Sequence, residues 1–278
     1  MNNRSIIDPW RQVGRIVATL TLAATPLFGS CQMNDTPDPA EFRLNTTTAA
    51  DVFGRSALRD LARAAAAGRA DEVTLRVKAG ADPNGRGAEG ITPLFWSFFA
   101  RNADGMRALL QTGADPNLPM HIRTKADEWD EYPVVAAAKA EAVDLLAILL
   151  EHGANPESMG ATNTALTAAA GCLECIKLLV KHGANINRVT HRGETVATVA
   201  SAIGHHDAII YLLEHGYNVD LGRLAWDVED RPGSPAVQAK KDKIVAMIRA
   251  KGVDPWFPEW QKREMEAQRA KQQKTTKP

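Results

Sequence analysis

Two cysteines three residues apart form the most chemically suggestive motif of the chain. Cys172 and Cys175 lie in the stretch "CLEC". A CxxC pair can exchange with other thiols and disulfides, or supply half of a zinc site. Neither function fits well, because no strand–helix–strand pattern surrounds the pair and no further ligands stand at zinc-binding spacing. Structural thiols and a local disulfide formed in an oxidising compartment both stay open.

Three histidines recur at similar points of the chain. His152, His182 and His215 each come directly before a glycine, so they could form a row of imidazoles. Such a row can resemble a metal site, but a histidine near a helix C-terminus also interacts favourably with the helix dipole. We therefore assign these histidines a structural role and expect neither a metal nor a cofactor.

The remaining sequence contains no motif that points to catalysis. The GxSxG, HExxH and P-loop signatures are absent, and no GxGxxG opens a helix after a strand. Acidic residues are plentiful, but Asp82 and Asp115 belong to a repeated pentapeptide, so their recurrence is architectural. We expect no catalytic residues and therefore no enzyme.

The pentapeptide "GADPN" occurs at 80–84 and again at 113–117. Weaker copies follow as "GANPE" (153–157), "GANIN" (183–187) and "GYNVD" (216–220). Their glycines are 33, 40, 30 and 33 residues apart, and a last degenerate copy has Gly252. A nearly constant period of this length predicts a repeat architecture.

Each repeat has the pattern of two helices. An apolar pair stands three and four residues before the later glycines, which is the core face of a helix that ends at a left-handed glycine. In the first half of one repeat, Thr92 can cap a helix, Pro93 suits the first turn, and Leu94 begins the apolar face. The pattern predicts helix, short turn, helix, glycine stop and a returning loop.

These motifs resemble the ankyrin repeat. "TPLFWSFF" (92–99) is similar to the family's TPLHxAA helix start, and "GCLECIKLLVKHGANIN" (171–187) to its second half, although Val196 replaces the usual proline in the next repeat. The resemblance implies an all-α solenoid of about five repeats, with a capping unit, over 56–255. It also puts Cys175 where the family has a core valine, and it implies a protein partner held on the concave side.

The N-terminal residues 1–31 have the features of a bacterial export signal. Arg4, Arg11 and Arg15 precede the apolar run 16–28, whose 13 residues are too few to span a bilayer, since a spanning helix needs about 20. "LFGSC" resembles a lipobox in which Cys31 is lipidated. Phe28 departs from the usual leucine, so ordinary secretion or an uncleaved anchor stay open. Because Gln32 follows the cysteine, we expect the periplasmic face of the outer membrane, with 32–55 as a polar tether.

Charge is unevenly distributed along the chain. Residues 32–239 hold 19 basic and 27 acidic side chains, whereas 240–278 hold 11 basic and 5 acidic. The acidic body argues against nucleic acid and suits a protein partner with a basic face. Residues 256–278 are predicted to form a charged C-terminal helix, either a solvated cap or a contact with anionic lipid head groups. We expect the free protein to be a monomer.

The 40-residue interval contains an insertion between Asn117 and Tyr132. Repeat insertions often map to the binding face. This one places Trp129 among four acids, a composition typical of a recognition surface around an aromatic anchor: Asp127, Glu128, Asp130 and Glu131. A tolerated loop outside the helical stack is the alternative. Phe99, expected to be exposed on an inner helix, and Lys139 would extend the surface.

Exported ankyrin-repeat proteins with lipobox-like leaders resemble those encoded beside phospholipase effectors of type VI secretion, where they neutralise the toxin in the producing cell. The resemblance implies a periplasmic immunity protein. An adaptor or regulator of an envelope complex or periplasmic enzyme is the alternative, and gene neighbourhood would separate the two.

Overall fold

The computed structural model describes residues 41–123, 127–230 and 232–253. They fall into two compact units, one ending at Ala184 and the other beginning at Asn185. The predicted export signal, with Cys31, and the predicted tail 256–278 lie outside the described residues. No helix among the described residues is both long enough and apolar enough to cross a membrane.

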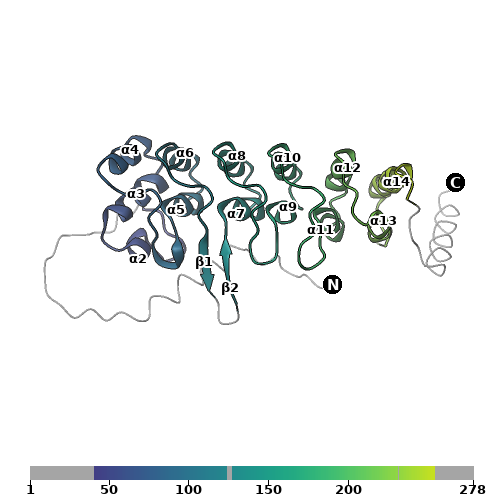
Figure 1. Cartoon of the computed structure of the whole chain (residues 1–278), viewed down its shortest axis with the longest axis horizontal. Helices are drawn as coiled ribbons and strands as arrows, with labels where there is room; N and C mark the ends of the chain where they lie inside the picture. The colour runs from purple at the N-terminus through teal and green to yellow at the C-terminus, as the bar shows by residue number, and fades with distance from the viewer. Residues whose placement is uncertain (1–40, 124–126, 231, 254–278) are drawn as a thin grey trace. The chain divides into compact units, whose positions relative to one another are not determined.

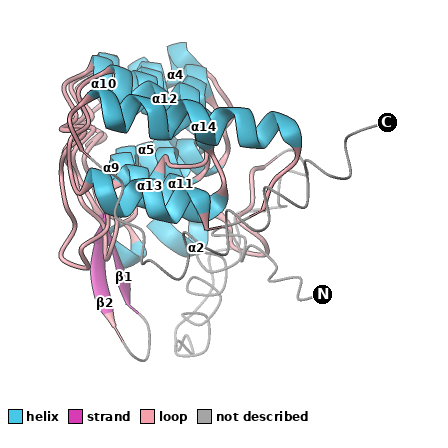
Figure 2. Cartoon of the chain, turned by 90° about the vertical axis from the view of Figure 1, so that its right-hand side faces the viewer, coloured by secondary structure: helices cyan, strands magenta, loops and turns pink. Residues whose placement is uncertain are grey.

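The first unit consists mainly of paired helices in two layers (Figures 1 and 2). One layer holds α3 (Ala57–Ala66), α5 (Pro93–Phe99), α7 (Pro133–Lys139) and α9 (Ala165–Ala168). The other holds their partners α4 (Ala70–Lys78), α6 (Ala103–Gln111), α8 (Val143–Glu151) and α10 (Leu173–Lys181). A short 3-10 helix, η2 (Ala88–Gly90), precedes α5. This is the predicted helix–turn–helix repeat.

The second unit continues the pattern with two more pairs. These are α11 (Val196–Ile203) with α12 (His206–Glu214), and α13 (Leu221–Glu229) with α14 (Pro235–Ala250). The buried Tyr217 hydroxyl lies 2.8 Å from Thr195 Oγ1. On the surface, Lys240 Nζ contacts Asp207 Oδ2 at 2.6 Å, and this hydrogen bond lowers the pKa of Asp207.

The helices begin and end at the capping residues and glycines from which their boundaries were predicted. Thr92 Oγ1 accepts the Phe95 N–H at 3.3 Å, with Pro93 in the first turn. Gly80 and Gly113 have φ values of 96° and 101°, in the left-handed region that glycine enters without a steric penalty. The predicted caps and glycine stops are confirmed.

The last residue of the repeated pentapeptide links one repeat to the next. Asn84 donates its Nδ2 hydrogen to the Gly113 carbonyl (2.9 Å), and its Oδ1 accepts the Asp115 N–H (2.7 Å). Asn117 makes the same two bonds to the following repeat, and Asn187 makes them within the second unit. An amide side chain can donate and accept at once, which explains why the turn recurs.

Part of the predicted polar tether is folded. Helix α2 (Ala49–Phe53) packs against α3, and a capping box between Thr48 and Asp51 begins it. The rings of Phe42 and Phe53 lie edge-on to Trp96, with centroids 5.2 and 6.0 Å away. Residues 41–53 therefore cover Trp96, and their aromatic side chains outweigh the polar composition around them.

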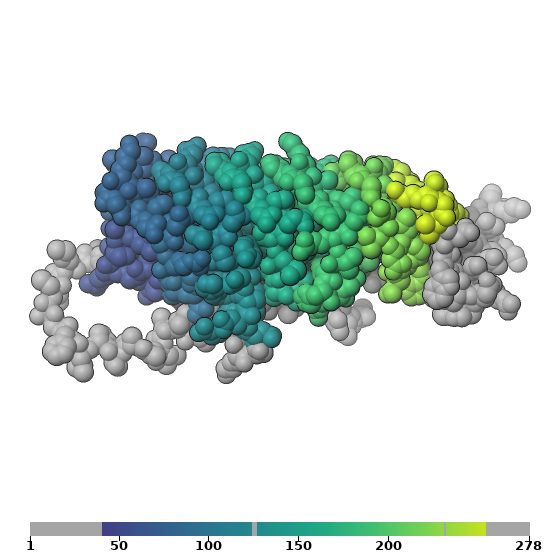
Figure 3. Space-filling view, in the orientation of Figure 1, coloured from purple at the N-terminus to yellow at the C-terminus, as the bar shows by residue number. Residues whose placement is uncertain are grey.

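The insertion departs from the all-α pattern. It forms an antiparallel hairpin of β1 (Met120–Arg123) and β2 (Glu128–Glu131), which projects beyond the layer of α5 and α7, away from α6 and α8 (Figures 1 and 3). Strands were not expected here. The residues of β1 alternate between buried and exposed, which explains why this segment forms a strand. Successive side chains of a strand point to opposite faces, so a strand with one face packed against the protein buries every second side chain.

Candidate partner-binding site

The strand register sorts the insertion into two faces. Met120 pairs with Glu131 and Ile122 with Trp129, while His121 pairs with Asp130. Opposed residues of an antiparallel pair share a face, and successive residues alternate between faces. Trp129 therefore lies on the face opposite to Glu128 and Asp130, whereas Glu131 shares its face. Two of the four acids expected around Trp129 thus point away from it.

The outward face of the hairpin consists of paired charges. Arg123 Nε lies 3.1 Å from Glu128 Oε2, with both side chains largely exposed. The hydrogen bond with Glu128 raises the pKa of Arg123. His121 Nδ1 makes a second cross-strand contact, with Asp130 Oδ1. The face thus presents basic side chains opposite acidic ones in a fixed order rather than a purely acidic surface.

Arg86 anchors this face to the preceding repeat. Its Nη1 donates to the Pro119 carbonyl at 2.8 Å and lies 3.3 Å from His121 Nε2. Because a guanidinium can only donate, Nε2 must accept, which leaves the Nδ1 hydrogen for Asp130. The two contacts thereby select one tautomer of His121 and orient its ring.

The inward face of the hairpin is apolar at its centre. Ile122 is buried and lies opposite the half-buried Trp129. Trp129 Nε1 is shielded from solvent and has no hydrogen-bond partner among the described residues. An unsatisfied buried donor is costly, so the hydrophobic contact of the indole outweighs this loss in the free protein.

Glu131 and Lys139 meet in an ion pair at the base of the hairpin. Lys139 Nζ donates to both carboxylate oxygens, at 2.7 and 2.9 Å. Only 6% of the Glu131 side chain is exposed, against 29% for Lys139. A Cβ placed on Gly160 would come within 2.8 Å of Glu131 Oε2, so the carboxylate also fills space beside the next loop. These two predicted contact residues hold the hairpin in place.

Phe99 does not lie where its expected role required. Only 7% of the residue is exposed, and its ring packs 5.9 Å from the rings of both Phe95 and Phe98. The expected exposure is wrong because three phenylalanines on one short helix bury one another. Asp127, in contrast, is exposed beside β2.

The two cysteines and two of the three histidines make contacts within their own repeats. Cys172 and Cys175 form a disulfide at the start of α10, which selects one of the two interpretations left open. His152 and His215 each point Nδ1 at a carbonyl of their own helix, at 2.8 and 2.7 Å. Within the described ranges, no three His, Cys, Asp or Glu side chains are grouped to hold a metal ion.

Sequence reasoning missed the basic side chains of the hairpin. His121 and Arg123 in β1 face Asp130 and Glu128 in β2, and Arg86 reaches them from another repeat. Strict alternation in "MHIR", with acidic residues of "EWDE" at the positions that match His121 and Arg123, is the signal that could have predicted the hairpin. The contact from Arg86 has no such local signal.

Comparisons with known proteins agree with this architecture. A family model of ankyrin repeats in many copies matches residues 165–213. Ankyrin repeat domain-containing protein 37 of Homo sapiens is 31% identical over 112 residues, which are 39% of this chain and 67% of that protein. The B-cell lymphoma 3 protein homolog of Mus musculus is 25% identical over 185 residues, 65% of this chain and 39% of that protein.

A third relative is an enzyme by name. The intracellular phospholipase A2 of Caenorhabditis elegans is 29% identical over 124 residues, which are 41% of this chain but 11% of that protein. The chain thus spans 11% of this relative and 39% of the lymphoma protein homolog. Repeat proteins of this kind generally act as protein-binding modules. The chain belongs to the ankyrin-repeat family.

Proposed function

We propose that the protein is a non-catalytic immunity protein of the periplasm, which neutralises a secreted phospholipase-type toxin by binding it directly. The observation that carries this proposal is the β1–β2 hairpin, an insertion that projects from the repeats with a fixed order of charges on its outer face. Its base is packed, so the face is preorganised for a partner, which reduces the entropy lost on binding.

The partner surface in this proposal has two parts. The outer face of the hairpin supplies Arg123, Glu128 and Asp130 for polar contacts, and Asp127 adds a further exposed acid. Trp129 supplies a half-buried aromatic edge on the other face. The body, with 27 acidic against 19 basic residues over 32–239, adds long-range attraction for a partner with a basic face.

The proposed location of the protein in the periplasm rests on the N-terminal export signal and on Cys31, which lie outside the described residues. Lipidation at Cys31 would tether the repeats to the outer membrane through a shorter polar segment than the sequence indicates, because the fold already begins near residue 41. Cys31→Ala should abolish palmitate labelling and leave unprocessed precursor. Unchanged labelling in this variant would contradict the lipoprotein assignment.

The decisive experiment begins with gene neighbourhood. If a lipase gene lies beside this one, its product is directed to the periplasm of a sensitive strain, with and without the full chain. The chain should restore growth, and purified toxin should bind it in titration. Restored growth without measurable binding, or binding without protection, would contradict neutralisation by direct contact.

Variants then locate the surface. Trp129→Ala should weaken toxin binding by about 2 kcal/mol, as for an aromatic hot spot. Neutralising Asp127, Glu128 and Asp130 together should mainly slow association and flatten its salt dependence. Leu75→Ser, at an exposed position of α4, is the control and should bind as the wild type does. Wild-type affinity in both hairpin variants would move the site to another face.

A further inference from the structure

The fourth repeat closes its inter-helix turn differently from the others. In the second and third repeats, the N–H of the residue that caps the outer helix donates to a carbonyl five residues earlier. Asn102 thus bonds to Ser97, and Ala142 to Ala137, both at 3.1 Å. In the fourth repeat, the N–H of Cys172 instead bonds to Ala169, three residues earlier, at 2.8 Å.

A deletion explains the difference. The turn residue Arg101 stands nine positions after the helix cap Thr92 in the second repeat, but Gly171 stands only seven positions after Thr164 in the fourth. Helix α9 accordingly has four residues where α5 has seven. Arg101 is left-handed (φ 53°), whereas Gly171 is absent from the positive-φ glycines. The disulfide therefore stands where the regular backbone closure is missing.

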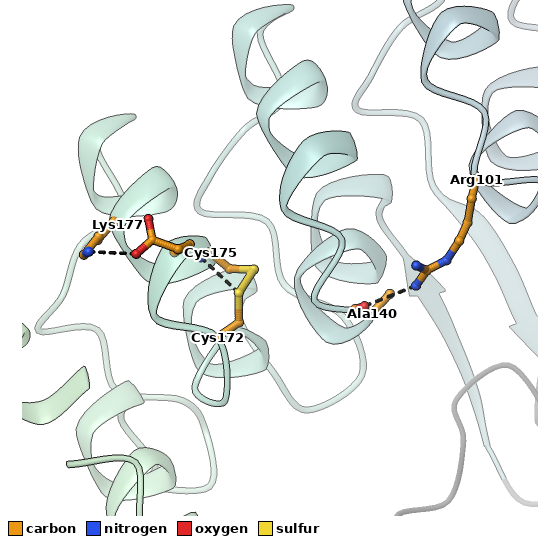
Figure 4. Close-up of a disulfide and its surroundings, with 6 residues drawn as sticks. Arg101, Ala140, Cys172, Cys175 and Lys177 are labelled. Carbon is orange, nitrogen blue, oxygen red and sulfur yellow. Dashed lines mark hydrogen bonds and ion pairs between the residues drawn. A yellow bond between two sulfur atoms is a disulfide. The ribbon is translucent and has the colours of Figure 1, made fainter. Parts of the chain in front are cut away.

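The two cysteines of this disulfide are buried to different degrees. Cys172 caps α10 and is half-buried, whereas Cys175 is fully buried. The Cys175 N–H points at Cys172 Sγ, 3.1 Å away (Figure 4). The less buried side of the disulfide is therefore Cys172, the side open to approach by an external thiolate, while Cys175 is shielded by the repeat.

We propose that the Cys172–Cys175 disulfide is a thiol–disulfide exchange site for an external dithiol. One thiolate of the dithiol attacks Cys172 Sγ, so a mixed disulfide forms and the electron pair of the broken bond leaves on Cys175. The second thiol of the reductant, once deprotonated, then attacks its own sulfur in the mixed disulfide and releases Cys172. The dithiol ends as a disulfide, and both cysteines end as thiols after taking up two protons.

The same placement suits the reverse reaction. In the reduced protein, the Cys175 N–H and the positive end of α10 stabilise a thiolate at Cys172, which favours its attack on an external disulfide. Cys175, three residues away and buried, then attacks Cys172 and expels the external thiolate. Exchange at this site is stoichiometric and needs no strand–helix–strand fold around it.

The test compares two single-cysteine variants of the pair in the full chain. Cys175→Val keeps Cys172 and restores the side chain usual in this family, and Cys172→Ser keeps Cys175 under a serine cap. Each variant is incubated with oxidised glutathione, quenched by alkylation and mapped by peptide mass, which separates Cys31. Cys172 should form the mixed disulfide at least about tenfold faster than Cys175, because reactivity follows access and thiolate stability.

A second measurement uses the wild-type chain alone. Dithiothreitol should open the disulfide while the circular dichroism of the folded repeats persists, and air or oxidised glutathione should close it again. Equal labelling of the two cysteines in folded protein would overturn the proposal. So would a disulfide that resists dithiothreitol until urea unfolds the chain, and this result is decisive even if one variant fails to fold.

Discussion

Two acid–base pairs of similar geometry hold the β1–β2 hairpin, one within it and one between β2 and the following helix α7, in opposite environments. At the base, Glu131 and Lys139 meet at 2.7 Å, largely out of water; at the tip, Glu128 and Arg123 meet at 3.1 Å, with more than 60% of each side chain exposed. We use "base" for Met120, Ile122 and Glu131, and "tip" for Arg123 and Glu128. From the distances alone, the two ion pairs would be expected to stabilise the protein by nearly equal amounts.

Solvent makes them different. Removing one partner of a buried pair leaves a desolvated charge without compensation, whereas exposed pairs contribute little because water and salt screen them. The base should therefore determine whether the hairpin stays folded, and the tip should be free to vary with the partner. The insertion is neither a loop outside the stack nor wholly a structural element.

The largest effect is expected from the cation at the base. Lys139→Met leaves the buried Glu131 carboxylate unpaired and should lower the free energy of unfolding by about 3 kcal/mol. Glu131→Gln should cost less, because Lys139 is 29% exposed and can turn toward water. Urea denaturation of the two variants checks the order. Equal losses would mean that the Glu131 carboxylate is solvated in solution.

The next effect separates two adjacent residues on opposite faces of β1. Ile122→Ala should cost about 2 kcal/mol, as for a buried large-to-small change in a thin layer. Arg123→Ala should leave the denaturation midpoint unchanged, because its side chain faces solvent. Thermal unfolding of both variants checks this. Destabilisation by Arg123→Ala as large as that by Ile122→Ala would contradict the assigned faces.

The sequence was sufficient for the repeats because their information is local. Helix caps such as Thr92, glycine stops such as Gly113 and the apolar pairs between them act within a few residues, so the paired helices were predicted correctly. Phe99 was misplaced for a related reason. Its exposure was predicted from the position that it takes in a typical inner helix of the family. In this chain, the neighbouring phenylalanines give Phe99 apolar contacts that a typical inner helix lacks.

The hairpin and its contacts depend on non-local pairing. Whether Trp129 shares a face with Glu128 and Asp130 depends on whether the insertion forms strands or an irregular loop. Its length is compatible with both conformations. The pair of Glu131 and Lys139 joins a strand to the following helix, and Arg86 reaches His121 across 35 residues. Whether Cys172 and Cys175 form a disulfide depends on their surroundings in the fold. Their spacing in the sequence is therefore compatible with both free thiols and a disulfide.

A smaller effect is expected at the centre of the hairpin. Trp129→Phe removes the buried indole N–H that lacks a partner while it keeps an aromatic ring, so stability should change by less than about 0.5 kcal/mol. Trp129→Ala should cost about 1 kcal/mol, since the half-buried side chain loses its contact with the Ile122 face. Urea denaturation distinguishes them. A large loss of stability in Trp129→Phe would indicate that Nε1 donates a hydrogen bond in solution.

The smallest effect on stability belongs to the tip, where the order of charges can be reversed. Arg123→Glu combined with Glu128→Arg keeps a cross-strand pair, and because water screens both positions the denaturation midpoint should not move. Arg123→Glu alone instead faces Glu128, with Glu89 also near enough to act on position 123, so the strand ends should separate locally. Amide exchange in β1 would report this opening while α5 and α7 stay protected. Binding measurements then complement the stability measurements. For a partner that contacts Arg123 and Glu128, the double reversal should alter the association rate and its salt dependence, although the fold is unchanged. A partner that binds the reversed tip at the wild-type rate at both low and high salt contacts the protein elsewhere.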